Sequence, residues 1–216
     1  MDAIALEPTQ VEIPAQDVRL PGDLTLPPRA TGLVIFAHGS GSSRLSRRNR
    51  WVAQALNGRG LATLLFDLLA PEEEAERANV FDIRLLVNRL LAATRWADQA
   101  AEVGRLPVGY FGASTGAAAA LCAAAELGDG ISAVVSRGGR PDLAEERLGD
   151  VTAPTLLIVG GNDWTVLELN EQAASLLNCP HELAIVPDAT HLFEEPGTLE
   201  RVAELAGEWL EKHLTT

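Results

Sequence analysis

The chain has 216 residues, which is enough for one domain with a substantial core that needs no disulfides or metals. Apolar residues make up 47% of it and charged residues 22%, ordinary globular values that exclude disorder, collagen and coiled coil for the whole chain. A formal net charge of −13 would repel phosphate backbones and anionic bilayers, so we expect neither nucleic acid nor a membrane surface as a partner. We expect a single domain over residues 1–216.

Cysteine usage and the amino-terminal residues indicate the compartment. Cys122 and Cys179 are the only cysteines, too few for a disulfide-stapled secreted scaffold and without the paired spacing of a metal site. Residues 1–7 show no basic region and no long apolar run, so no signal peptide is visible. The longest apolar stretch, 117–125, is about half of what a membrane span needs. We therefore expect a cytoplasmic protein with reduced cysteines and no metal.

Predicted strands and helices alternate along most of the chain. Near the amino terminus, residues 18–26 around Pro21-Gly22-Asp23 predict a small antiparallel hairpin at a sheet edge. Short all-apolar runs, each typical of a strand covered on both faces, follow at 32–37, 61–66, 107–111, 131–135, 155–159 and 183–186. Apolar residues at three- and four-residue steps predict amphipathic helices, most clearly at 83–102 and 198–214. This alternation predicts an α/β fold with a mostly parallel sheet and helices on both faces.

A G-x-S-x-G motif, Gly112-Ala113-Ser114-Thr115-Gly116, lies between a predicted strand and an alanine-rich helical segment, 117–127. A serine in such a tight turn has its hydroxyl held out from the backbone, at a helix N-terminus that favours negative charge. The alternative is an ordinary turn serine, because the motif alone is only moderately specific. The strand–turn–helix setting favours Ser114 as a nucleophile.

A serine nucleophile needs a base, and His191 is the best placed of four histidines. His213 lies in the last turn of the final predicted helix, His181 opens a strand, and His38 belongs to a glycine-rich loop that precedes Ser114. His191 lies in a loop between the last predicted strand and the last predicted helix. The alternative is a loop histidine that caps the helix.

The base needs an orienting acid, and we expect Asp163, directly after the predicted strand 155–159. It could instead belong to an ordinary Asn-Asp turn, and Asp188 is a rival because it is close to His191. However, Asp188 lies at a strand end and is too near in sequence to brace the ring easily. The chain order nucleophile, acid, histidine is the one used by folds that carry a serine in such a strand–turn–helix motif. These residues also follow the carboxyl ends of predicted parallel strands, which share one edge of the sheet.

The loop 38–43, His-Gly-Ser-Gly-Ser-Ser, follows the first central strand, and its glycines let backbone amides turn toward a pocket. In this architecture one oxyanion donor is the amide after the nucleophile, here Thr115, and the other comes from this loop. We expect the Ser40 amide as that second donor, with Gly39 as the next choice and a substrate contact. A phosphate-binding loop is the competing interpretation, but neither glycine-rich phosphate motif is present.

Several further residues are candidates for substrate contact. Trp164 and Phe193 flank the proposed acid and base and could line an acyl pocket or simply pack. Arg44 could recognise a substrate carboxylate, or the cationic cluster to which it belongs could pair with the acidic run 72–76 or be solvated; the cluster comprises Arg44, Arg47, Arg48 and Arg50. Residues 68–81 are the only candidate flap, so we expect an open site suited to short acyl chains.

These motifs resemble the α/β-hydrolase superfamily, and more closely the small, lidless members of the dienelactone hydrolase family, over residues 18–214. The resemblance implies acyl transfer to water through an acyl-enzyme, with no metal or organic cofactor. True dienelactone hydrolases use a cysteine nucleophile, whereas position 114 is serine, which favours a general carboxylesterase. Similar domains also occur fused to phosphoribosyltransferase domains, and we expect none here.

The residues and the resemblance together predict a Ser114–His191–Asp163 serine hydrolase that cleaves a small-molecule ester or lactone. Neutral His191 would take the Ser114 proton, so activity should rise with pH through a value near 7. The alternatives are a non-catalytic ligand-binding or scaffold protein on the same fold, a thioesterase, or a dienelactone-type lactonase. The sequence does not predict the oligomeric state.

Overall fold

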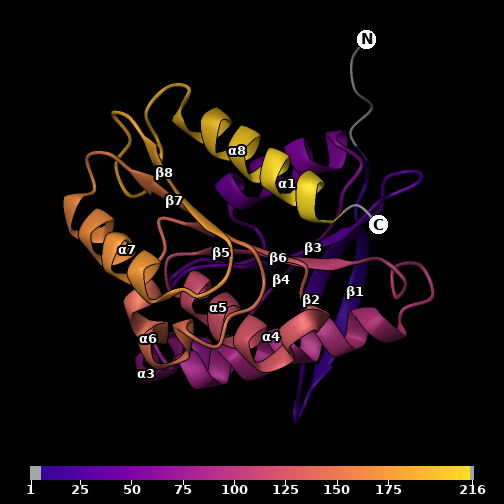
Figure 1. The fold of residues 1–216 in the computed structure, drawn as a ribbon. Coiled ribbons are helices and arrows are strands. Elements are labelled where there is room, and N and C mark those ends of the chain that lie inside the picture. Colours follow the sequence, from indigo (N-terminus) through magenta and orange to yellow (C-terminus); the bar gives the residue numbers. More distant parts are fainter. Residues whose placement is uncertain (1–5, 215–216) are drawn as a thin grey trace.

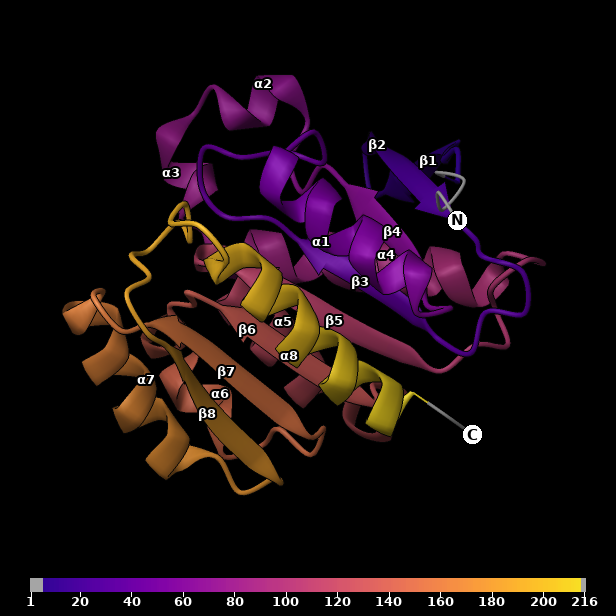
Figure 2. The same ribbon diagram turned by 90° about the horizontal axis from the view of Figure 1, so that it is seen from above.

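A computed structural model describes residues 6–214, where eight strands form one sheet with helices on both faces (Figures 1 and 2). The strand order is β1-β2-β4-β3-β5-β6-β7-β8; the pairs β1–β2 and β2–β4 are antiparallel and all others are parallel. The prediction of a mostly parallel α/β sheet with an antiparallel amino-terminal hairpin at its edge is therefore confirmed. The strands are β1 Thr9–Ala15, β2 Val18–Thr25, β3 Leu33–Ala37, β4 Ala62–Phe66, β5 Val108–Ala113, β6 Ala133–Arg137, β7 Thr155–Gly160 and β8 His181–Val186.

The long helices form two layers around this sheet. Helices α1 (Arg47–Gly58) and α8 (Thr198–His213) pack against each other on one face, and α4 (Ile83–Gln99), α5 (Thr115–Leu127) and α7 (Trp164–Leu176) cover the other (Figure 2). Short helical turns lie in the connections: α2 Pro71–Glu74, α3 Arg77–Val80, a 3₁₀ turn Gly128–Gly130, a second Pro141–Ala144, and α6 Glu145–Leu148. Both sheet faces are thus withdrawn from water over the central strands.

Burial on both faces explains why the central strands lack alternation of apolar and polar residues. All residues of β3, β4 and β5 are buried. In β3, Val34 and Phe36 point into the core under α1 and α8, whereas Leu33 and Ile35 point into the core under α4 and α5. Successive side chains on a strand point to opposite faces, so a strand between two layers must be apolar throughout.

The predicted amino-terminal hairpin exists, but its predicted turn is wrong. Pro21-Gly22-Asp23 lies inside β2, and the turn is at Gln16-Asp17, between β1 and β2. Two features explain why these residues can lie within a strand. Pairing of β2 with β4 begins only at Gly22, so Pro21, which has no amide hydrogen, need not donate to β4. A β-carbon at position 22 would lie 3.0 Å from the Val11 side chain, so the strand pairing requires glycine there. Tertiary contacts therefore overrode the local turn signal.

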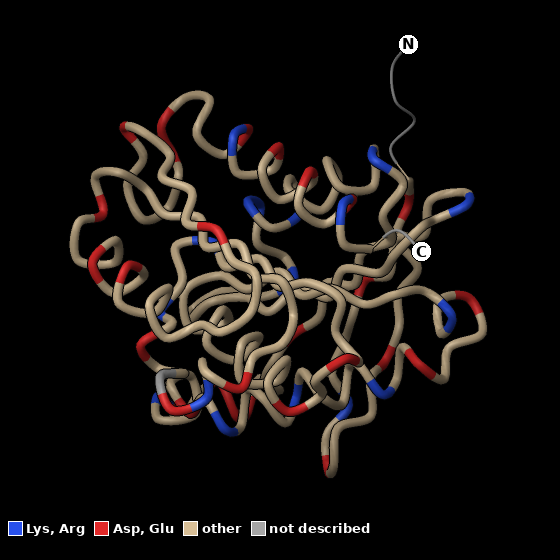
Figure 3. The backbone as a smooth tube through the Cα atoms, viewed as in Figure 1, with Lys and Arg blue, Asp and Glu red and all other residues tan. Residues whose placement is uncertain are grey.

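The described residues show neither a region of one charge sign nor a membrane-spanning helix. Acidic and basic side chains are scattered over the outer helices and loops rather than gathered on one side (Figure 3). Between residues 6 and 214 no helix has the length and apolar character that a bilayer crossing requires. The same residues include no cluster of three or more His, Cys, Asp or Glu side chains that could hold a metal ion.

Candidate active site

The predicted site residues follow the carboxyl ends of four strands on one edge of the sheet. Ser114 comes directly after β5, Asp163 follows β7, His191 follows β8, and the loop that begins at His38 follows β3 (Figure 1). Strand β5 lies between β3 and β6, and β6 separates it from β7. In doubly wound sheets this edge is where ligands bind.

Ser114 occupies a sharp turn between β5 and α5. Its backbone has φ +52° and ψ −120°, a conformation that L-residues rarely adopt. A β-carbon at Gly112 would lie 2.5 Å from the Ala117 Cα, and one at Gly116 would lie 2.2 Å from the Ala37 carbonyl oxygen. Both motif glycines are therefore required, because α5 turns back tightly over β5 and against the end of β3.

The loop 137–140 (Arg-Gly-Gly-Arg), which begins at the last residue of β6, holds Ser114 in this turn. The Ser114 amide donates to the Arg137 carbonyl at 3.3 Å, and the Arg140 amide donates to the Ser114 carbonyl at 3.1 Å. Sequence reasoning missed this loop. A Gly-Gly pair just after a predicted strand was the available signal, because it permits the close approach of backbone that the fold requires here.

His191 and Asp163 form a hydrogen-bonded pair. His191 Nδ1 lies 2.7 Å from Asp163 Oδ2, and the Asp163 side chain is 15% exposed. The rival carboxylate, Asp188, is exposed, and only its backbone carbonyl accepts a bond here, from the Asn162 side chain at 3.0 Å. With Nδ1 bound to Asp163, His191 Nε2 remains for a second partner.

Ser114 and His191 both contact the backbone of residues 137 and 138, but they do not bond to each other directly. Among residues 6–214 no hydrogen bond links the Ser114 hydroxyl to His191. Gly138, which follows the residue that accepts the Ser114 amide, adjoins His191: a β-carbon there would lie 3.6 Å from its ring Cε1. Catalytic hydrogen bonds are often long before substrate binds, so this arrangement is compatible with proton transfer.

The loop that follows β3 packs directly on the serine turn. A β-carbon at Gly39 would lie 3.0 Å from the Ser114 Cβ, so glycine is required at this position. The Ser40 amide donates to Thr115 Oγ1 at 3.0 Å. Thr115 begins α5, where the helix itself does not use the first amides. The structure thus brings the two expected amide donors, Ser40 and Thr115, to one place, with the Ser40 amide bound to a side chain.

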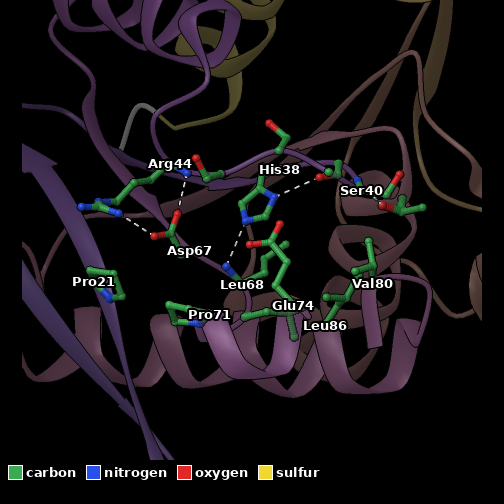
Figure 4. Close-up of a pocket in the computed structure, with 16 residues that line it drawn as sticks. Pro21, His38, Ser40, Arg44, Asp67, Leu68, Pro71, Glu74, Val80 and Leu86 are labelled. Atoms are coloured by element: carbon green, nitrogen blue, oxygen red, sulfur yellow. Dashed lines mark hydrogen bonds and ion pairs between the residues drawn. The ribbon is translucent and has the colours of Figure 1, made fainter. Parts of the chain in front are cut away.

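A cavity of about 180 Å³ opens beside this loop (Figure 4). Ser40 and Thr115 lie at one end of it, and Leu68, Val80 and Leu86 contribute apolar walls. His38 lines it too, with Nε2 accepting the Leu68 amide at 3.0 Å and Nδ1 placed to donate to the Gly39 carbonyl at 3.0 Å. Burial lowers the pKa of His38, so the ring is neutral and fastens the loop to the wall.

The segment 68–81, the expected flap, is a fixed wall of this cavity. It carries α2 and α3 and is tied down by Glu73, whose side chain pairs with the buried Arg89 and accepts the Ala70 amide at 3.0 Å. The Glu73 carbonyl accepts the Asn79 side chain at 2.9 Å. The Glu73–Arg89 pair fastens the segment to α4 and the Leu68 amide fastens its start to His38, whereas the Ala70 and Asn79 bonds brace the segment internally.

The arginine cluster pairs with carboxylates other than the run 72–76, so that alternative was wrong. Arg44 binds Asp67 through both its amide and its guanidinium, at 2.7 and 2.5 Å, and lies 3.8 Å from Asp23. Arg50 also pairs with Asp23, at 3.1 Å. Arg48 pairs with Glu194 at 2.9 Å. The charge of Arg44 is therefore balanced by protein carboxylates, although its Nε has no hydrogen-bond partner among the described residues.

The two aromatic candidates have opposite surroundings. Trp164 is 75% exposed at the start of α7, and Phe193 is 2% exposed in the core under α8. Of the two possibilities for Phe193, lining an acyl pocket or packing, the structure supports packing. Its ring lies 5.9 Å from the guanidinium of Arg137, a buried cation with no carboxylate in ion-pair range among the described residues.

Comparison with known proteins places the chain in a family. A sequence model of the "Dienelactone hydrolase family" matches residues 24–214. The crystal structure of a dienelactone hydrolase from Anabaena variabilis is 53% identical, with a TM-score of 0.95, over 97% of this chain and 99% of that one. Est1E from Butyrivibrio proteoclasticus (20% identical, TM-score 0.82, 94% of this chain and 98% of that one) is similar in fold. XC6422 from Xanthomonas campestris, described as an "a/b serine hydrolase without lid", is also similar in fold: it is 21% identical, with a TM-score of 0.79, over 97% of this chain and 96% of that one.

A relative from Mycobacterium tuberculosis, named "Putative phosphoribosyl transferase", is 59% identical over 209 residues, which is 97% of this chain and 47% of that protein. The chain thus spans about half the length of this relative. The matched family residues include the serine turn, the His191–Asp163 pair and the six strands from β3 to β8. With the sheet order and the site at its carboxyl edge, this shows that the chain belongs to the dienelactone hydrolase family and has the α/β-hydrolase fold.

Proposed function

We propose that the chain is a serine hydrolase that cleaves short-chain carboxylic esters or lactones through an acyl-enzyme on Ser114. The observation that carries the proposal is the strained Ser114 turn, held by the loop 137–140 beside the hydrogen-bonded His191–Asp163 pair. A backbone strained at a residue with a reactive side chain is typical of a functional site, because packing elsewhere must offset the cost.

In the first half of the reaction, His191 Nε2 takes the Ser114 proton as Oγ attacks the ester carbonyl. Asp163 holds the ring tautomer and stabilises the imidazolium. His191 then gives the proton to the leaving alcohol, and the acyl group stays on Ser114. Water enters, loses a proton to His191 and releases the acid, which restores the serine.

The tetrahedral intermediate needs donors for its oxyanion, and the amides of Thr115 and Ser40 are the candidates. Each such donor contributes about 3 kcal/mol to the transition state. The Ser40 amide is bound to Thr115 Oγ1 in the free protein. Rotation of the Thr115 side chain, or sharing of the amide, would free it for the oxyanion.

The cavity beside Ser40 favours small acyl groups. Its volume is about 180 Å³, below the roughly 300–1,000 Å³ of pockets that hold drug-sized ligands. The wall 68–81 is tied down, so a long chain has no movable segment to displace. Short esters and lactones are therefore the expected substrates. Phosphoribosyl transfer, in the name of the mycobacterial relatives, finds no support in this cavity, because Arg44 is paired with Asp67 and the carboxylate of Glu74 disfavours phosphate.

The test compares Ser114→Ala with Ser175→Ala, a control at an exposed serine of α7. With 4-nitrophenyl butyrate we expect Ser114→Ala to lower kcat by at least about 10⁴-fold with unchanged folding, and Ser175→Ala to match the wild type. A serine-reactive fluorophosphonate should label the wild type and the control only. An active or labelled Ser114→Ala protein would refute the nucleophile, and activity that stays flat from pH 5 to 9 would refute a histidine base. An unlabelled wild type would favour a binding protein.

A further inference from the structure

We infer that the cavity beside Ser40 discriminates acyl groups by charge: it accepts neutral or cationic groups, best with a hydrogen-bond donor, and rejects groups that carry a carboxylate. The inference rests on the proposed function, because it places the acyl group of an ester attacked by Ser114 in this cavity. It assigns Glu74 as the residue that sets the preference.

The location of the cavity supports this use. Thr115 and Ser40, the residues whose amides would receive the oxyanion, both line the cavity, and Thr115 directly follows Ser114 in the chain, so the cavity lies next to the proposed reaction centre. The walls beyond them are mainly apolar, from Leu68, Leu69 and Leu86. In apolar surroundings a few polar groups determine which ligand binds, because each unpaired charge there is costly.

Two of the ionisable groups in the cavity wall are already satisfied. Both Asp67 oxygens accept bonds from Arg44, Oδ1 from its amide and Oδ2 from its guanidinium. His38 has both ring nitrogens engaged and is neutral, because burial lowers its pKa. Neither the arginine nor the histidine therefore offers a cation to a substrate carboxylate.

Glu74 differs from these groups. Its side chain extends from α2 toward the His38 ring at the centre of the cavity (Figure 4). Within residues 6–214 its carboxylate has no hydrogen bond and no ion pair, although Arg47 and Arg48 line the adjoining hollow, where Arg48 pairs with Glu194. Arg44 and Asp67 cancel, so Glu74 leaves the cavity with a net negative charge.

A carboxylate in this position has two consequences for an acyl group. A hydroxyl or ammonium of the substrate can donate to Glu74, and a charge-assisted hydrogen bond is stronger than a neutral one. Glu74 is exposed on α2 and lines the cavity, so a substrate carboxylate bound there would meet a like charge that only solvent screens, and the two would repel. The preferred substrates are therefore short esters with a neutral, hydroxylated or amino-bearing acyl chain.

The experiment uses 4-nitrophenyl esters of one leaving group and similar length: butyrate, 3-hydroxybutyrate, β-alanine and the monoester of succinate. Values of kcat/KM are divided by the rate of hydroxide hydrolysis of each ester, which removes intrinsic reactivity. For the wild type we expect the succinate value to lie at least about tenfold below butyrate, and the hydroxylated and amino-bearing esters at or above butyrate. Glu74→Gln should reduce the gap between butyrate and succinate at least about fivefold and remove any advantage of the hydroxylated and amino-bearing esters over butyrate.

Glu72→Gln is the matched control, because Glu72 is exposed on the same helix and does not line the cavity. It should keep the wild-type order of esters. A succinate ester that is cleaved as fast as butyrate, or a gap that persists in Glu74→Gln, would overturn the inference while butyrate turnover and labelling of Ser114 still support the proposed function. A selective loss of succinate turnover in Arg44→Met would also overturn it. Absence of butyrate turnover together with an unlabelled Ser114 would end both.

Discussion

Gly138 and His191 are in contact at the centre of the candidate active site. A β-carbon at position 138 would lie 3.2 Å from the His191 carbonyl oxygen and 3.6 Å from its ring Cε1. Gly138 also has φ +51°, which favours glycine. The carbonyl of the preceding residue, Arg137, accepts a hydrogen bond from the Ser114 amide, so Gly138 lies between the proposed nucleophile and its base.

We therefore expect Gly138→Ala to lower kcat for butyrate esters about tenfold or more, because small displacements of a catalytic group are costly. The strained backbone should also lower the free energy of unfolding by about 1–2 kcal/mol. Gly128→Ala is the control: Gly128 has φ +53°, but a β-carbon there would meet nothing within 4 Å. In urea unfolding, Gly128→Ala should lower the free energy of unfolding by a similar amount, and its kcat should equal that of the wild type. Equal kcat losses in both variants would contradict the role assigned to Gly138.

Ser114 stores backbone strain that glycine would release. Its φ of +52° is unfavourable for any residue with a β-carbon, so Ser114→Gly should exceed Ser114→Ala in free energy of unfolding by about 1 kcal/mol. Ser175 lies in helix α7, where the order should reverse, because glycine is about 1 kcal/mol worse than alanine in a helix. Urea unfolding of the four variants tests this. A Ser114→Gly protein less stable than Ser114→Ala would show that the turn is not strained.

Arg137 is a buried guanidinium whose removal should cost little. It is 7% exposed, its Nε and Nη1 have no hydrogen-bond partner, and its bond to Asn49 is long, at 3.4 Å. Burial, and secondarily the charge of Arg48, lowers the pKa of Arg137 to about 10. An apolar side chain of similar length avoids this desolvation.

Arg137→Met should therefore leave the free energy of unfolding unchanged or raise it. Arg137→Lys should lower it by about 1–3 kcal/mol, because a compact ammonium is hydrated more strongly than a guanidinium and loses the contact with the Phe193 ring. Urea unfolding at neutral pH measures both. A Met variant that is less stable than the Lys variant would mean that the guanidinium is well satisfied in the native protein.

His38 should make the protein sensitive to mild acid. Its Nε2 accepts the Leu68 amide, and burial lowers its pKa. Below about pH 6.5, the ordinary value for histidine, the unfolded chain binds a proton that the native protein does not. The free energy of unfolding therefore falls as the pH falls below that value, until the lowered native pKa is reached.

His38→Gln is neutral at every pH and can still accept the Leu68 amide. It should show a shallower loss of stability between pH 6.5 and 5 than the wild type, in urea unfolding at matched ionic strength. Equal slopes for the two proteins would mean that the His38 ring is not held neutral by burial.

The sequence predicted most of the fold because its signals are local. Each observed strand from β3 to β8 overlaps its apolar run, since a strand between two helical layers must be apolar throughout. The G-x-S-x-G turn was likewise readable from its setting between a strand and a helix. The hairpin turn was not, because Pro21-Gly22-Asp23 has turn chemistry and only its pairing with β1 and β4 shows that it is extended.

Residue types and their order along the chain were enough to name Ser114, Asp163 and His191 as a candidate site, because parallel strands bring their carboxyl ends to one edge. Only the tertiary structure decided which groups contact one another. It paired Arg44 with Asp67 rather than with the acidic run, buried Phe193, left Glu74 without a partner, and placed the loop 137–140 between serine and histidine. Such pairings depend on distances of a few ångströms between residues far apart in sequence, and local patterns do not specify those distances.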